Sequence, residues 1–131
     1  VWMVYKLGGR RYGILVSINS EKFGFTTSSD GTSWLFSGIG TYTVLANTTY
    51  YVKFGWTGTT YYLDYSLDGE TYTRDITYDS TSACYNGLAI SQIGVYSYST
   101  SYDQYFKGSI DLSGCYITIN NSVWWTGFIT E

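Results

Sequence analysis

The chain has 131 residues, of which 44% are hydrophobic and 13% charged, and its formal net charge is -3. This length predicts a single domain of residues 1–131, which we expect to be part of a larger protein because no initiator Met begins it. The 7 Lys and Arg against 10 Asp and Glu exclude a nucleic-acid partner, and the lack of any ~18-residue apolar run excludes membrane insertion.

Short strands separated by turn residues are predicted along the whole chain. Ala is scarce, no window keeps a helical apolar stripe, and turn residues recur, as in Asp30-Gly31, Gly38 and Asp68-Gly69. No internal repeat and no linker is found. About a dozen short strands at this spacing predict an all-β, two-sheet antiparallel β-sandwich or a barrel. We expect strands at residues 3–7, 12–18, 22–27, 33–36, 41–45, 50–56, 60–67, 71–77, 88–98, 105–112, 115–119 and 123–128.

Alternation by two assigns the side chains of the central strands to opposite faces. Because neighbouring side chains of a strand point to opposite sides, one set is expected in the core: Tyr50, Phe54, Trp56, Tyr61 and Tyr65. Leu63 is expected to point to the same side as Tyr61 and Tyr65. The opposite face is expected to carry Tyr51, Lys53, Tyr62, Asp64 and Ser66.

The C-terminal third carries the most specific motif. Phe106-Lys107-Gly108-Ser109-Ile110-Asp111 is followed by an alternating apolar strand that contains Cys115-Tyr116-Ile117 and by the pair Trp124-Trp125. Together with the central hairpin and its Asp68-Gly69 turn, this resembles concanavalin A-like (laminin G-like) jelly-roll domains. The resemblance covers roughly residues 46–127, and the final segment is similar to modules of phage tail and fibre proteins and of gut-bacterial surface proteins.

The resemblance implies a jelly roll of two antiparallel sheets that binds sugars or protein surfaces. Some relatives are glycoside hydrolases with two Glu on one strand, a pattern that Glu21, Glu70 and Glu131 do not reproduce. Some relatives hold a structural calcium ion, for which this chain offers only scattered acids in or near turns: Asp30, Asp68, Asp79 and Asp103. We therefore expect no cofactor and leave a structural calcium ion open.

Catalytic chemistry has few candidate groups in this sequence. The absence of His removes the commonest general base and metal ligand. Asp64 and Asp75 lie on neighbouring predicted strands and could approach as a carboxylate pair, but solvated strand carboxylates are the favoured interpretation. Cys84 and Cys115 either form one disulfide or remain thiols. We expect a protein that is not an enzyme.

The surplus of aromatic residues, 21% of the chain, favours a binding function. Rings beside short polar side chains match the apolar faces and hydroxyl groups of sugars, although surface Tyr is also common on strands. Trp124 and Trp125 should point to opposite faces, so that one is outward. The candidate ligand-binding residues are Tyr96, Tyr98, Tyr102, Asp103, Gln104, Tyr105, Tyr62, Asp64, Tyr51 and Trp125.

The sequence therefore predicts a non-catalytic, lectin-like module of a virion or extracellular surface protein. Its expected partners are a cell-surface glycan or polysaccharide and the neighbouring domains of the parent protein. The alternative is a structural domain of a phage tail, fibre or head that packs against neighbouring subunits. A glycoside hydrolase is the least favoured alternative.

Overall fold

The computed structural model describes residues 2–5, 14–84, 90–93, 95–98, 101–105, 116–119 and 122–126, with side chains described for residues 20–84. This part of the chain contains strands and turns and no helix, so none of it could cross a membrane as a helix. The strands are β1 (Trp2–Tyr5), β2 (Ile14–Asn19), β3 (Lys22–Thr27), β4 (Phe36–Thr43), β5 (Tyr51–Trp56), β6 (Thr60–Ser66), β7 (Thr73–Asp79), β8 (Ile90–Ile93), β9 (Val95–Tyr98), β10 (Ser101–Tyr105), β11 (Tyr116–Ile119) and β12 (Ser122–Thr126).

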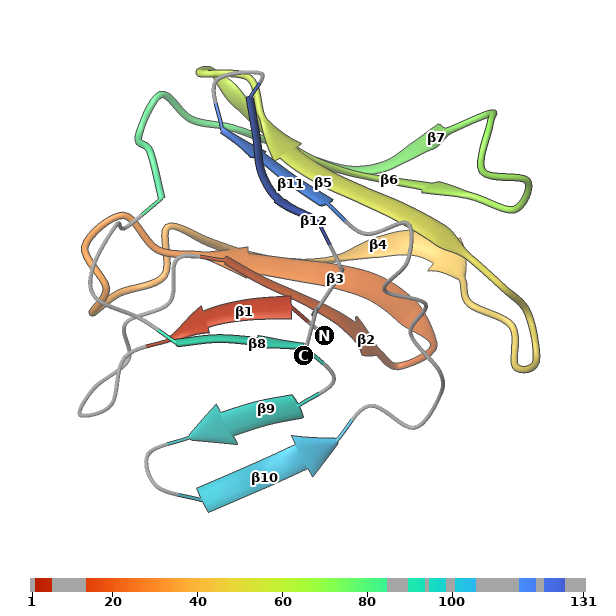
Figure 1. Ribbon diagram of the computed structural model, residues 1–131, viewed down its shortest axis with the longest axis horizontal. Coiled ribbons are helices and arrows are strands. Elements are labelled where there is room, and N and C mark those ends of the chain that lie inside the picture. The colour runs from red at the N-terminus through yellow and green to blue at the C-terminus, as the bar shows by residue number, and fades with distance from the viewer. Residues whose placement is uncertain are drawn as a thin grey trace.

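Two larger antiparallel sheets organise the molecule (Figure 1). One has five strands in the order β4-β3-β2-β1-β8, and the other has three in the order β5-β6-β7. The chain leaves the first sheet after β4, builds the second sheet, and returns to place β8 beside β1. The pairs β9–β10 and β11–β12 form separate hairpins. The described chain is thus all-β and antiparallel, as predicted, and is consistent with a β-sandwich.

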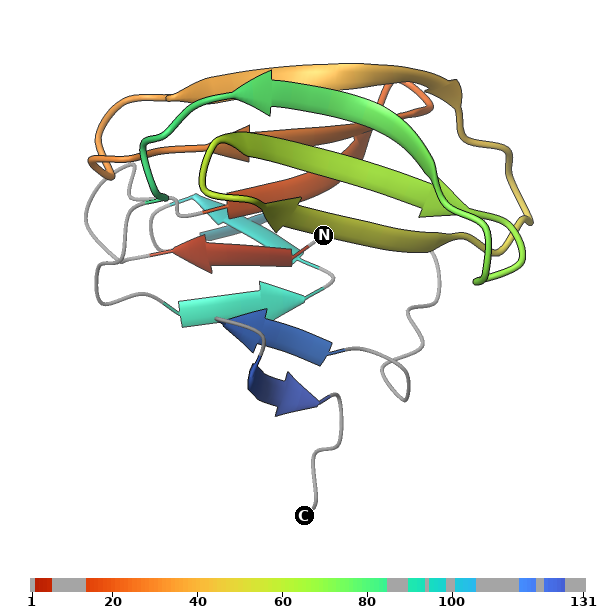
Figure 2. The ribbon, with the colours of Figure 1, turned by 90° about the horizontal axis from the view of Figure 1, so that it is seen from above.

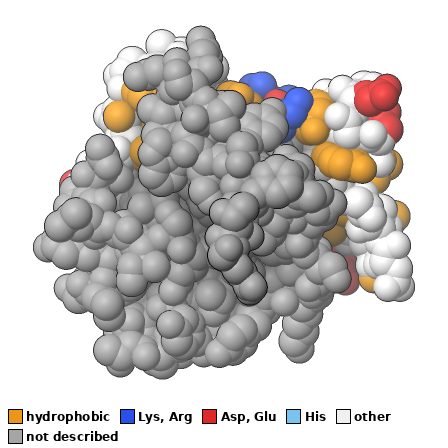
Figure 3. All heavy atoms as spheres, viewed as in Figure 1, with side chains coloured by type: hydrophobic (Ala, Val, Ile, Leu, Met, Phe, Trp, Pro, Cys, Tyr) orange, Lys and Arg blue, Asp and Glu red, His pale blue; other side chains and the backbone are white. Residues whose placement is uncertain are grey.

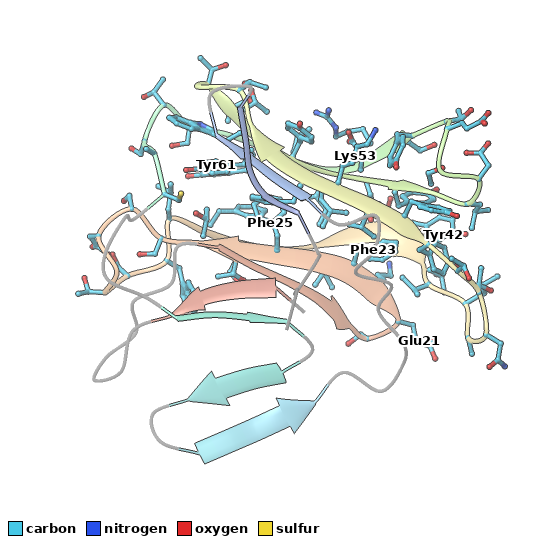
Figure 4. All side chains as sticks on the ribbon, in the orientation of Figure 1. Glu21, Phe23, Phe25, Tyr42, Lys53 and Tyr61 are labelled. Atoms are coloured by element: carbon cyan, nitrogen blue, oxygen red, sulfur yellow. The ribbon has the colours of Figure 1, made fainter. Side chains whose placement is uncertain are left out.

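The core lies between β3 of the first sheet and β6 and β7 of the second. Its buried side chains are Phe23, Phe25, Tyr61, Leu63 and Ile76, and Tyr61 and Leu63 have no exposed surface. Figure 4 shows Phe25 and Tyr61 between the two sheets. Apolar residues at every second position of these strands turn their side chains to the same side. Burial therefore confirms the predicted inward side for Tyr61 and Leu63.

Interlocking aromatic rings fill most of this core. The Phe25 ring packs against Phe36 at 4.7 Å and Phe54 at 5.0 Å between centroids. The Tyr61 hydroxyl donates a hydrogen bond to the Ser82 carbonyl oxygen at 2.8 Å. Burial raises the pKa of Tyr61 to about 12. The hydrogen bond gives this buried hydroxyl the partner that a desolvated polar group requires.

Trp56 departs from the predicted core and is 39% exposed. It lies at the end of β5, which is the edge strand of its sheet, so no neighbouring strand covers it on that side. Its ring stacks on Tyr61 at 5.7 Å between centroids, and its indole N–H donates to the Ser80 carbonyl oxygen at 3.0 Å. Trp56 therefore covers the rim of the core.

Asp75 connects the two sheets at a β-bulge. Leu63 pairs with Ile76 and Asp64 with Arg74, so Asp75 is the extra residue of β7. A bulge re-aims a side chain, and the Asp75 Oδ1 atom accepts hydrogen bonds from the Thr41 amide at 2.8 Å and the Tyr42 amide at 3.0 Å. These amides belong to β4, which lies alongside β7 (Figure 2).

The β4 backbone is itself irregular opposite this carboxylate. Lys22 pairs with Thr43 and Gly24 with Ile39, so the ladder between β3 and β4 is interrupted and the Thr41 and Tyr42 amides bond to Asp75. A Cβ atom on Gly40 would lie 2.8 Å from Asp75 Oδ1 and closer still to Cγ and Oδ2. Gly40 is thus required for the close approach of the carboxylate to β4.

Several predicted strand boundaries were wrong. Residues 33–36 and 41–45 were predicted as two strands with a turn at Gly38, but β4 runs unbroken from Phe36 to Thr43. The Ser33 amide instead donates to Asp30, which keeps Ser33 in the preceding turn. Residues 88–98 were predicted as one strand, but β8 and β9 belong to different sheets. Parts of the predicted strands 3–7, 12–18, 105–112, 115–119 and 123–128 lie outside the described residues.

Two turns share one sequence pattern, Ser-x-Asp-Gly-x-Ser/Thr followed by an aromatic residue, although no repeat was predicted. The first spans residues 28–34 between β3 and β4, and the second spans residues 66–72 between β6 and β7. In each, the glycine has a positive φ (Gly31 74°, Gly69 79°) and donates its amide to the Ser side chain, Ser28 or Ser66.

The Asp carboxylates close both turns in the same way. Asp30 Oδ1 accepts from the amides of Thr32 and Ser33 at 2.7 and 2.8 Å. Asp68 Oδ1 accepts from the amides of Glu70 and Thr71, each at 2.8 Å. The predicted Asp-Gly turns are confirmed, and their sequence pattern accounts for the geometry because each oxygen satisfies donors that a turn leaves without a backbone partner.

Candidate binding face

The face of the β5–β6–β7 sheet that points away from the core carries aromatic and charged side chains. We define this outer face by the residues Tyr51, Lys53, Tyr62, Asp64, Tyr72 and Arg74. Lys53 of β5 pairs with Asp64 of β6, and Asp64 pairs with Arg74 of β7. The register therefore places a cation on each side of the carboxylate, in one row across the sheet.

The Asp64–Arg74 pair is the centre of this row. The Arg74 Nε and Nη2 atoms donate to the two carboxylate oxygens of Asp64, which form an ion pair with the guanidinium. The Asp64 side chain is 14% exposed, whereas that of Arg74 is 46% exposed. The Arg74 guanidinium also lies 4.2 Å from the centroid of the Tyr62 ring. Tyr62 and Asp64 thus hold Arg74 in place from two sides.

Lys53 is held by a ring of the neighbouring turn. Its Nζ atom lies 3.3 Å from the centroid of Tyr72, the aromatic residue that ends the second Ser-x-Asp-Gly turn. Figure 4 shows Lys53 on the side of its strand away from Phe23 and Phe25. In Figure 3, Lys and Arg side chains lie beside hydrophobic ones along the upper edge of the view.

Tyr51 is the accessible ring of the outer face. It is 47% exposed, and its ring packs on Gly69, where a Cβ atom would lie 3.2 Å from Tyr51 Cε1. The turn therefore supports Tyr51 as well as Lys53. Tyr62 is half-buried, and the Arg74 guanidinium lies over its ring.

A shallow depression lies on the other side of the same turn. It has a volume of about 250 Å³ and is lined by Tyr42, Tyr65, Ser66, Leu67, Asp68, Thr71 and Thr73. The Tyr42 and Tyr65 rings stack there at 4.0 Å between centroids. This volume is smaller than the ~300–1,000 Å³ of pockets that enclose a drug-sized ligand. The depression could hold one small group.

The turn carboxylates stay ionised because of their hydrogen bonds. The Thr71 and Glu70 amides, followed by the Ser66 hydroxyl, lower the pKa of Asp68 to about 2. The hydrogen bonds of Ser33, followed by those of Thr32, hold the pKa of Asp30 well below its ordinary value. Among residues 20–84, no group of three or more acidic or thiol side chains is arranged to hold a metal ion.

The carboxylate pair of Asp64 and Asp75, which the sequence left as the less favoured alternative, does not form. Asp64 binds Arg74, while Asp75 binds the Thr41 and Tyr42 amides through Oδ1. The Asp75 Oδ2 atom is buried without a hydrogen-bond partner among the described residues. Asp64 pairs across the strands with Arg74 rather than with Asp75, and Asp75 at the bulge is directed toward β4.

The predicted ligand-binding residues divide into separate regions. Tyr51, Tyr62 and Asp64 lie together on the outer face. The β9–β10 hairpin, with Tyr96, Tyr98 and residues 102–105, lies at the opposite end of the molecule in Figure 1. The two groups therefore do not form one site. The side chains of that hairpin lie outside the described residues, as does that of Trp125 on β12.

The strand pairing in β9–β10 and β11–β12 shows where the predicted alternation of side chains is interrupted. Tyr102 pairs with Ser97 and Gln104 with Tyr96, which makes Asp103 an extra residue at a bulge. Ile117 pairs with Trp125 and Thr118 with Val123, which makes Trp124 another. The strict alternation assumed for Trp124 and Trp125 is therefore interrupted at this position.

Three residues of the outer face were missing from the predicted site: Lys53, Tyr72 and Arg74. Alternation did place Lys53 beside Tyr51, and this signal could have included it in the site. Tyr72 and Arg74 follow the Asp68-Gly69 turn, and placing them on this face needed the register between β6 and β7, in which Asp64 pairs with Arg74.

Cys84 is a half-buried free thiol that packs against the core. Burial raises the pKa of this thiol, which favours its neutral form. Cys115 lies outside the described residues.

Comparisons with known proteins give no match: no family model, no curated protein and no solved structure is similar to this chain. The arguments that follow therefore depend on the geometry of the outer face.

Proposed function

We propose that the protein is a non-catalytic recognition module that binds glycans through the outer face of the β5–β6–β7 sheet. The observation that carries this proposal is the exposed Tyr51 ring beside Lys53, Asp64 and Arg74, whose positions are fixed by the sheet register and the Asp68 turn. A sugar has apolar C–H faces and a rim of hydroxyl groups. A flat ring next to fixed donors and acceptors complements both.

The rigidity of this face supports the proposal. Tyr62 and Asp64 hold Arg74, Tyr72 holds Lys53, and Gly69 supports Tyr51. Side chains that are ordered before binding lose less conformational entropy when the ligand arrives. An open face binds each sugar weakly, so affinity would come from repetition of the module on a fibre or a multidomain chain.

The strand order supports the proposed concanavalin A-like jelly roll. In a Greek key, three consecutive strands are followed by a fourth that returns to lie beside the first. The first sheet has a related order, in which β1 to β4 form a meander and β8 returns after the second sheet to lie beside β1. The proposed setting is a larger virion or extracellular surface protein. The β9–β10 hairpin, with Tyr98 and Tyr102, is a second proposed contact region, and Trp125 on β12 is a third.

A glycan array followed by titration tests the proposal. Tyr51→Ala should weaken binding about three- to tenfold, because an aromatic contact contributes about 0.5–1.5 kcal/mol. Ile39→Ala is the matched control, because Ile39 is 53% exposed on the other sheet. Tyr98→Ala and Tyr102→Ala test the hairpin in the same way. Binding that survives Tyr51→Ala unchanged would remove the outer face from the proposal.

A second candidate function is packing against neighbouring subunits of an assembly. Exposed aliphatic side chains favour it, since Ile39, Leu45 and Leu67 are 53%, 59% and 57% exposed. Mass measurement by light scattering separates the two functions. A stable oligomer that dissociates on Leu45→Asp or Leu67→Asp would support assembly, and a monomer at high concentration would contradict it.

A further inference from the structure

The two cations of the outer face differ in their partners. Arg74 is paired with Asp64, whereas Lys53 has the Tyr72 ring and no carboxylate partner among residues 20–84. Asp64 is the cross-strand neighbour of both, and Arg74 already binds both of its oxygens. Lys53 and Arg74 against Asp64 therefore leave these six residues one positive charge in excess, while Asp79 at the end of β7 accepts from the Thr60 hydroxyl and Asp68 and Glu70 lie in the adjoining turn.

The excess charge is fixed in space and accessible. An ammonium over an aromatic ring is attracted to it and loses mobility, and the Lys53 side chain is exposed. An ammonium has three N–H donors, and none of those of Lys53 has an oxygen partner among the described residues. Arg74 has five donors, of which Nε and one on Nη2 are used by Asp64.

The spacing of Lys53 from Tyr51 fits one sugar unit. The two residues are separated by one position on β5 and lie on the same side, about 6.7 Å apart along the strand. A pyranose ring on Tyr51 could thus extend a substituent on its C6 atom toward the Lys53 ammonium. The unpaired donors of Arg74 lie on β7, two strands across the sheet from Lys53.

We propose that the outer face selects acidic glycans, in which the carboxylate of a hexuronic acid binds Lys53 while its ring packs on Tyr51. This inference rests on the proposed glycan-binding function and specifies the substrate class. A neutral sugar leaves the Lys53 charge without a counter-charge. A nucleic acid would require many more cations than these two to neutralise its phosphates.

Matched sugars that differ in the oxidation of C6 test the inference. The probes are trimers of galacturonate and galactose, of glucuronate and glucose, and of mannuronate and mannose, titrated at low and high salt. Lys53→Met removes the charge and keeps a long side chain over Tyr72. Lys22→Met is the control, because Lys22 lies on β3 in the other sheet. Thermal unfolding shows that each variant is folded.

At least one acidic trimer should bind about three- to tenfold more tightly than its neutral partner, and salt should weaken this preference. Lys53→Met should abolish the preference, and Lys22→Met should keep it. Equal binding of acidic and neutral partners in all pairs would overturn the inference and leave glycan binding intact. Binding of neither class would overturn both proposals. Binding of a sulfated galactan alone would overturn the carboxylate preference.

Discussion

The contact of Asp75 with β4 gives the sharpest prediction about stability. Asp75→Ala removes the acceptor of the Thr41 and Tyr42 amides. A buried donor left unsatisfied costs about 1–3 kcal/mol. The Thr41 amide is exposed and can bond to water, so the Tyr42 amide dominates and we expect a loss of about 1–3 kcal/mol in the free energy of unfolding. At about 4 °C per kcal/mol for a chain of this size, Tm should fall by about 4–12 °C.

Gly40→Ala provides the second arm of a double-mutant cycle. In the wild-type background the new methyl group overlaps the Asp75 carboxylate, and overpacking of this kind costs about 1–3 kcal/mol. In the Asp75→Ala background the overlap disappears, and replacing glycine should be neutral or stabilise by about 0.4–1 kcal/mol. The coupling should therefore exceed the ~0.5 kcal/mol within which independent sites are additive.

Urea unfolding of the four proteins measures the cycle. Asp79→Ala is the control, because Asp79 is on the same strand but accepts from the Thr60 hydroxyl rather than from a backbone amide of β4. Its loss should stay below about 1 kcal/mol. Strictly additive effects of Gly40→Ala and Asp75→Ala would refute the proposed contact between the two sheets.

Three further predictions concern the core and the turns. Leu63→Ala should lower the free energy of unfolding by about 3–4 kcal/mol, measured by urea denaturation, because Leu63 has no exposed surface; a loss below 1 kcal/mol would contradict its burial. Tyr61→Phe should cost about 1 kcal/mol, seen in thermal melts, because it removes the hydrogen bond to Ser82; an unchanged Tm would count against that bond. The pKa of Asp68, lowered to about 2 from its ordinary value of ~3.9, stabilises the fold above pH ~4, and this contribution should disappear between pH ~4 and ~2. Tm should depend less on pH over that interval in Asp68→Asn than in wild type or Glu70→Gln, and identical profiles would contradict the assignment.

Regular alternation predicted the centre of the molecule well. Lys22–Thr27 is the predicted strand, and β5 and β6 lie within the predicted strands 50–56 and 60–67. Tyr61 and Leu63 are buried as expected. In these strands the local pattern and the packing agree, because a single-residue shift would expose the whole apolar set.

The prediction was wrong where the backbone departs from regular pairing. Bulges at Asp75, Asp103 and Trp124 depend on what the neighbouring strands require, and one sequence does not reveal that. The Asp75 side chain is directed by amides of β4, more than thirty positions away in the chain. Trp56 was misplaced because edge and central strands have the same alternation.

The residues of the candidate site were also predicted only in part. Tyr51, Tyr62 and Asp64 were found from alternation on β5 and β6. Arg74 was missed because its position beside Asp64 follows from the pairing of β6 with β7 rather than from alternation within one strand. The cation–π contact between Lys53 and Tyr72 joins a strand to a turn, a relationship that only the folded chain defines.

The hydrogen bonds of the two Ser-x-Asp-Gly turns indicate which turn residues can be substituted without loss of the turn. Their hydrogen bonds connect the Ser, Asp and Gly residues and the backbone amides, and those of the second turn use no side chain of Leu67 or Glu70. The second turn thus has a self-supporting frame with two variable sites at its tip. This frame adjoins Tyr51 and Lys53, so substitutions at Leu67 and Glu70 would change the surface beside the proposed binding face while the turn itself is preserved.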